Sequence, residues 1–196
     1  MLFDSGIDTN HVDLDGGKVI GWKDYVDDTA TPIDPLGHGT MVASIAAGTG
    51  EGDSTEVGFA PGAALVGIRV LDSIGQCPIS RMIDGINWAT SHRSSLGIDI
   101  INISAGQSGL SQTDFNNLNT AVTAAYNSGI IVFMACGNDG PEYNTLKQSS
   151  TCTNALSVGA MTDPYEGGWY PAAYSSRGSG NQCPYIMAPG TYIRAA

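Results

Sequence analysis

Three residues have side chains suited to proton transfer and anion stabilisation, and each lies at an end of an apolar run. Asp4 ends the run MLFD, His38 opens HGTMVASIAA, and Asn138 follows IIVFMACG. A carboxylate can orient an imidazole, a neutral imidazole can accept a proton, and a carboxamide can donate to a developing oxyanion. We interpret the three residues together as a candidate catalytic site.

His38 is expected in the first turn of a helix, because the residues that follow it are small and apolar, as in a buried helix. The partial positive charge of unpaired amides at a helix N-terminus disfavours an imidazolium ion. We therefore predict that the His38 ring is kept neutral, which suits a base.

Each candidate also has a purely structural interpretation. Asp4 in DSGID and Asn138 in GNDG both fit turns, and His38 could be a structural histidine. His11 and His92 have no supporting groups, and we interpret them as solvated or structural. The catalytic interpretation depends on finding the aspartate, the histidine and the amide together.

The elements that must position these residues alternate between strand and helix. Two segments, from Ser80 to about His92 and after Ser111 to Ala125, have apolar residues at helical spacing. The pattern predicts a three-layer α/β/α fold with a mostly parallel sheet, as one domain over residues 1–196. Such a sheet gathers reactive residues at the carboxyl ends of its strands. The expected strands are nearly continuous in apolar residues: MLFDSG, KVIGWKDY, ALVGIRVL, IDIINISAG, IIVFMACG, ALSVGAM and YIMAPG.

The composition excludes several classes of protein. Of the residues, 42% are hydrophobic and 14% charged, which is enough for a folded core, and no apolar run is long enough to span a membrane. Eight basic against 19 acidic side chains give a net charge of −11, which argues against nucleic-acid binding. The acidic loops could hold a structural calcium ion, although DTNHVDLDGG does not match an EF-hand. No cofactor is expected to be required.

The four cysteines are Cys77, Cys136, Cys152 and Cys183, and they form no CxxC pair that would indicate zinc or redox chemistry. They could be small buried hydrophobic residues, or they could form one or two disulfides in an exported protein.

The motifs DSGIDTNHVDLDG, GHGTMVASIAAG, GFAPGAALVGIRVLD, IINISAG, ACGNDG and YSSRGSG followed by MAPG resemble those of the subtilisin-like serine proteases, in order and over essentially the whole chain. The resemblance implies a secreted endopeptidase that acts on polypeptides. It assigns Asp4 the orienting carboxylate, His38 the general base, and Asn138 the amide that donates to the oxyanion.

The resemblance also implies which residues bind the substrate. Ser104, Ala105 and Gly106 match a strand end that pairs with the substrate backbone. Ala135, Cys136 and Gly137 match part of the wall of the pocket for the side chain that precedes the scissile bond.

The family's serine nucleophile has no match in this sequence, because the chain reaches APG at residues 188–190 and ends at TYIRAA. Ser5, Ser175 and Ser176 lack the glycine, threonine and helix start that would present a hydroxyl. We expect a peptidase domain that is incomplete at both ends and truncated before the serine segment. Such a chain would be inactive alone, and its partner would be its own missing C-terminal segment. The alternative is a noncatalytic peptide-binding pseudoprotease.

Overall fold

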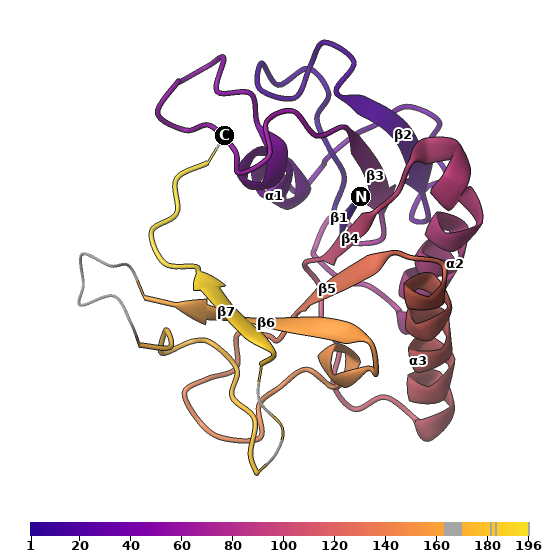
Figure 1. Cartoon of the computed structure of the whole chain (residues 1–196), viewed down its shortest axis with the longest axis vertical. Coiled ribbons are helices and arrows are strands. Elements are labelled where there is room, and N and C mark those ends of the chain that lie inside the picture. The colour runs from indigo at the N-terminus through magenta and orange to yellow at the C-terminus, as the bar shows by residue number, and fades with distance from the viewer. Residues whose placement is uncertain (163–169, 181, 183, 196) are drawn as a thin grey trace.

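Seven strands form one parallel sheet in the order β2-β3-β1-β4-β5-β6-β7 (Figure 1). The computed structural model describes residues 1–162, 170–180, 182 and 184–195. Every predicted strand is confirmed, and each is shorter than or equal to the apolar run that predicted it. The strands are β1 Leu2–Asp4, β2 Val19–Asp24, β3 Leu65–Arg69, β4 Ile100–Ile103, β5 Ile131–Ala135, β6 Ala155–Met161 and β7 Ile186–Pro189.

Helices lie on both faces of the sheet, which confirms the three-layer α/β/α fold (Figure 1). Helix α1 (His38–Ala47) contacts β1 on one face, and α2 (Ile79–Leu96) and α3 (Gln112–Asn127) pack together on the other. Ser111 caps α3 by accepting a hydrogen bond from the backbone N–H of Asp114. A short 3-10 helix, Gln148–Thr151, follows β5. No helix among the described residues is long and apolar enough to cross a membrane.

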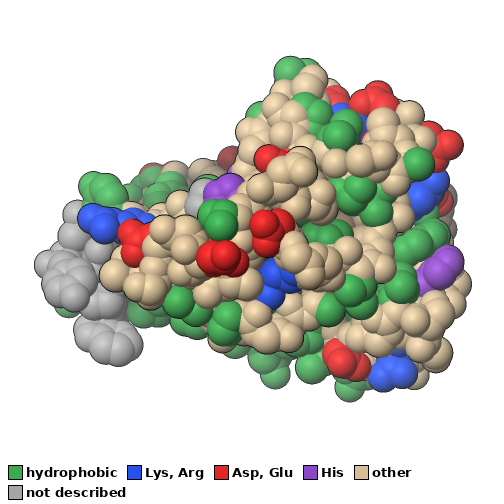
Figure 2. All heavy atoms as spheres, turned by 90° about the horizontal axis from the view of Figure 1, so that it is seen from above, with side chains coloured by type: hydrophobic (Ala, Val, Ile, Leu, Met, Phe, Trp, Pro, Cys, Tyr) green, Lys and Arg blue, Asp and Glu red, His purple; other side chains and the backbone are tan. Residues whose placement is uncertain are grey.

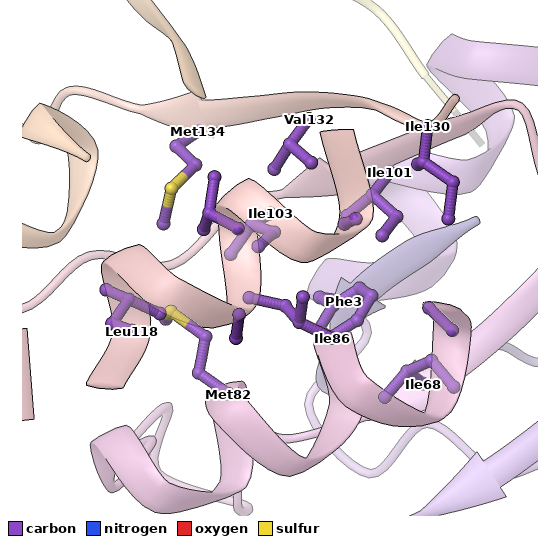
Figure 3. Packing of buried hydrophobic residues seen from close by; sticks show 14 of the residues in the cluster. Phe3, Ile68, Met82, Ile86, Ile101, Ile103, Leu118, Ile130, Val132 and Met134 are labelled. Carbon is purple, nitrogen blue, oxygen red and sulfur yellow. The ribbon is translucent and has the colours of Figure 1, made fainter. Parts of the chain in front are cut away.

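The main core lies between the sheet and helices α2 and α3 (Figure 3). Alternate strand residues face it, so that Phe3 of β1, Ile103 of β4 and Met134 of β5 are fully buried against Met82 of α2 and Leu118 of α3. Burying side chains of this size stabilises the fold by roughly 1.5 to 3 kcal/mol each. A smaller cluster on the opposite face, which includes Leu2 of β1 and Ala43 of α1, fixes α1 on β1.

The strand order reverses direction around β1. After β1 the chain builds β2 and β3 on one side, and then crosses to build β4 to β7 on the other. In parallel α/β sheets, ligands bind outside the carboxyl ends of the strands at such a reversal. Asp4, the last residue of β1, lies at this position.

Strands β4, β5 and β6 have buried residues on one face only, and β7 has none. On the face away from α2 and α3, Ile100, Ile131 and Ile186 are 48%, 46% and 40% exposed. The pairing register places Ile100 beside Ile131, and Phe133 beside Leu156, on this same face. Among the described residues, no helix covers this apolar surface.

Candidate active site

Asp4 and His38 form a hydrogen-bonded pair at the junction of β1 and α1. The Nδ1 atom of His38 lies 2.6 Å from Oδ1 of Asp4, and the carboxylate is only 1% exposed. The same oxygen accepts the backbone N–H of Ser5 at 2.7 Å. Because a carboxylate only accepts hydrogen bonds, it holds the proton on Nδ1 and leaves Nε2 with a free lone pair. Nε2, the ring nitrogen that does not face Asp4, can therefore accept a proton, and the His38 side chain is 40% exposed.

The pKa of His38 is raised, which is opposite to the effect of the helix N-terminus alone. The hydrogen bond to Asp4 is the largest cause; partial burial opposes it, and the charges of Asp4 and Asp34 add to it. The helix N-terminus disfavours the imidazolium, but a carboxylate at hydrogen-bond distance contributes more. The pair therefore stabilises the cation that forms when His38 accepts a proton.

Asp34 fixes the first turn of α1 to the chain that leaves β1. Its Oδ2 accepts hydrogen bonds from the backbone N–H and the hydroxyl of Thr40, at 2.7 and 2.6 Å. Its Oδ1 accepts from the Ser5 hydroxyl at 2.7 Å and from the N–H of Gly37 at 2.9 Å. Burial alone would raise the pKa of Asp34, but these hydrogen bonds together lower it. Asp34 was not predicted as a site residue, although an aspartate shortly before a helix start is a capping signal.

Helix α1 approaches β1 closely because residue 39 has no side chain. A Cβ atom at Gly39 would lie 2.1 Å from the carbonyl oxygen of Gly6 and 3.0 Å from Cβ of Asp4. The N–H of Gly39 also donates to the Ser5 hydroxyl at 3.0 Å. The glycine after the histidine therefore allows the contact between His38 and Asp4.

Five of the predicted site residues line one hollow of about 370 Å³ beyond the ends of β4, β5 and β6: Ser104, Ala135, Cys136, Gly137 and Asn138. Asn138 is exposed there, so its amide is free to meet a ligand. Ala105 and Gly106, with Ser104, line a smaller neighbouring hollow of about 210 Å³. Because β1, β4 and β5 are adjacent, the residues that end them lie on the same rim as Asp4.

The three serines considered as nucleophiles have structural partners. Ser5 is fully buried and donates to Asp34, and the hydroxyls of Ser175 and Ser176 accept the N–H groups of Ala160 and Asp139.

Cys136 is 1% exposed, and burial raises the pKa of its thiol. Cys77, Cys136 and Cys152 are free thiols; Cys183 lies outside the described residues. These three therefore fit the interpretation as buried or half-buried small residues.

The part of the chain that the structure describes contains no group of three or more His, Cys, Asp or Glu side chains placed to hold a metal ion. Figure 2 shows acidic and basic side chains dispersed over the face seen from above, rather than a gathered basic patch. This distribution agrees with the acidic composition.

A carboxylate-oriented histidine at the rim of a parallel, three-layer sheet defines the class of subtilisin-like α/β proteins. The chain belongs to the subtilase family, whose model matches residues 2–195. It is 34% identical to the serine protease AprX of Bacillus subtilis and to subtilisin DY of Bacillus licheniformis, and each match covers 98% of the chain. Among solved structures, a protein titled S41 psychrophilic protease has a TM-score of 0.84 at 31% identity over 99% of the chain. Sphericase has a TM-score of 0.82 at 30% identity over the whole chain.

The chain spans only part of these relatives. It covers 46% of AprX, 64% of subtilisin DY, and 66% and 67% of the two solved structures.

Proposed function

We propose that residues 1–196 are the part of a serine-type endopeptidase that carries its general base. The observation that carries this proposal is the 2.6 Å hydrogen bond between His38 and the buried Asp4 at the carboxyl rim of the sheet. The subtilase family and the relatives named as proteases support it.

In the proposed reaction, His38 Nε2 takes the proton of a serine hydroxyl as that oxygen attacks a peptide carbonyl. Asp4 keeps the imidazole in the required tautomer and stabilises the imidazolium. His38 then gives the proton to the leaving amine, which departs and leaves an acyl-enzyme. Water, activated by the same base, hydrolyses the ester and restores the serine.

Asn138 donates its amide to the carbonyl oxygen as negative charge develops there, a role worth about 10² to 10³ in turnover in subtilisin. The substrate backbone pairs with residues 104–106 as an added strand, which binds main chain independently of its sequence. Residues 135–137 form the wall beside the side chain that precedes the cleaved bond. Every step uses side chains and backbone groups, so the reaction requires no cofactor.

The nucleophile in this proposal is a serine outside residues 1–196. Two observations support it. The serines considered as substitutes are buried and form hydrogen bonds with other residues. The apolar face of β4 to β7 is exposed, as expected of a surface that a further segment of the protein covers. The relatives are longer than the chain, which leaves room for such a segment. Residues 1–196 alone are then inactive. We also propose, from the family resemblance, that the protein acts outside the cell.

Peptide cleavage by the protein produced from its complete gene tests this proposal. Unstructured peptides and mass spectrometry of the products would give kcat/KM for the wild type, His38→Ala and the control His92→Ala, whose ring stacks on Trp88 in α2. We expect His38→Ala to lose at least about 10³-fold and His92→Ala to stay near the wild type. Peptide binding without cleavage would instead support the noncatalytic alternative.

A further inference from the structure

One lysine side chain contacts both glycine residues that flank the proposed substrate cleft. A Cβ atom at Gly106 would lie 2.7 Å from Cγ of Lys147, and a Cβ atom at Gly137 would lie 2.7 Å from the same carbon. The backbone N–H of Lys147 donates to the carbonyl of Cys136 at 2.8 Å, which holds the lysine beside the end of β5. The methylene stem therefore fills the space between the two glycine backbones.

The ammonium group of Lys147 pairs with a more exposed partner. Its Nζ lies 2.6 Å from Oδ2 of Asp139, and the two side chains are 26% and 52% exposed. Moving the Asp139 side chain into water breaks an exposed ion pair that contributes little free energy. Moving Lys147 would also remove its stem from both glycine backbones. A competing ligand therefore displaces Asp139 more readily than Lys147.

We propose that Lys147 makes this cleft selective for substrates with glutamate or aspartate at the residue that precedes the cleaved bond. The inference rests on the proposed function. A substrate carboxylate takes the place of Asp139 on the ammonium, beside Gly137, and accepts a charge-assisted hydrogen bond from it. The ammonium repels a basic side chain at this position, and a neutral side chain gains no charge-assisted hydrogen bond from it. The substrate class is thus peptides with an acidic residue at this position.

Cleavage of peptides that differ only at this residue tests the assignment, with kcat/KM measured for Glu, Gln and Lys peptides on the protein from the complete gene. We expect the Glu peptide to be cleaved roughly 10-fold faster than its neutral isostere Gln, the ratio for one net charge-assisted hydrogen bond. Lys147→Met keeps the stem and removes the charge, so the Glu/Gln ratio should fall to about 1. Asp139→Asn leaves the ammonium without a competing carboxylate, so the ratio should rise.

The control is Lys23→Met, because Lys23 forms an ion pair of the same length with Asp28 in a different part of the fold. It should leave the Glu/Gln ratio unchanged. Equal cleavage of Glu and Gln peptides by the wild type, or an unchanged ratio in Lys147→Met, would overturn the assignment.

Calorimetric binding of the same peptides separates this inference from the proposed function. If no peptide is cleaved but the Glu peptide binds more tightly than the Gln peptide, the endopeptidase proposal fails and the role of Lys147 stands. If no peptide is cleaved and the two peptides bind equally, the role of Lys147 is refuted as well.

Discussion

Replacing Asp34 tests whether its carboxylate holds the histidine helix in place. Asp34→Ala removes the acceptor for the backbone N–H of Thr40 and for the hydroxyl of Ser5. Thr40 is 8% exposed and Ser5 is fully buried, so water cannot easily replace the lost acceptor. A buried donor left unpaired costs about 1 to 3 kcal/mol. The two unpaired donors together predict that the free energy of unfolding falls by roughly 2 to 6 kcal/mol. This is a large part of a typical stability of about 5 to 15 kcal/mol.

The pH dependence provides a second test of the same residue. Because the pKa of Asp34 is lowered in the folded state, its contribution to stability is present above its unfolded pKa of about 3.9. The contribution is lost as the pH falls through the lowered folded value. Urea unfolding of the wild type and of Asp34→Asn should therefore differ most at pH 7 and converge in strong acid.

A decrease of less than about 1 kcal/mol in the free energy of unfolding of Asp34→Ala at pH 7 would contradict this role of Asp34. A difference in stability between the wild type and Asp34→Asn that does not change with pH would also contradict it. The matched control is Asp53→Asn, because Asp53 lies in an exposed loop and its carboxylate accepts hydrogen bonds from Thr55, two residues along the chain. It should leave the unfolding midpoint nearly unchanged.

Two further substitutions and one labelling experiment probe the site. Asp4→Asn can keep an oxygen facing Nδ1 of His38 but loses the charge. The pKa of His38 should therefore fall in an NMR titration. An unchanged pKa would contradict the role of the carboxylate. Gly39→Ala places a Cβ 2.1 Å from the carbonyl oxygen of Gly6. It should lower kcat/KM by about 10²-fold while the helical circular dichroism is retained. Full activity would show that the close approach of α1 to β1 is unnecessary. Cys136 should resist alkylation at pH 8 until urea is added, because the thiol is buried and burial raises its pKa. Rapid labelling of Cys136 in the native protein would contradict its buried position.

The sequence predicts the strands and helices well, because buried parallel strands are nearly continuous in apolar residues. IIVFMA and ALSVGAM are apolar runs of this kind, and both contain strands. The order of the strands does not follow from such runs, because the pairing of β1 with both β3 and β4 joins residues far apart in the chain.

The candidate site was predictable only where a motif marks it. Asp4 and His38 lie at the ends of recognisable elements, and the structure brings them together. Asp34 and Lys147 escaped prediction because their roles depend on contacts with Ser5 and Gly106, which only the folded chain creates. The raised pKa of His38 also depends on the folded chain, since the effect of the Asp4 carboxylate depends on its distance from the ring.

Labelling with a fluorophosphonate, which reacts with activated serine hydroxyls, measures most directly whether the Asp4 and His38 pair serves a serine. The protein from the complete gene would be treated with the probe, digested and mapped by mass spectrometry. The account predicts one labelled serine outside residues 1–196, with labelling slowed by about 10³-fold in His38→Ala. A label on a serine within residues 1–196, or equally fast labelling of His38→Ala, would contradict it.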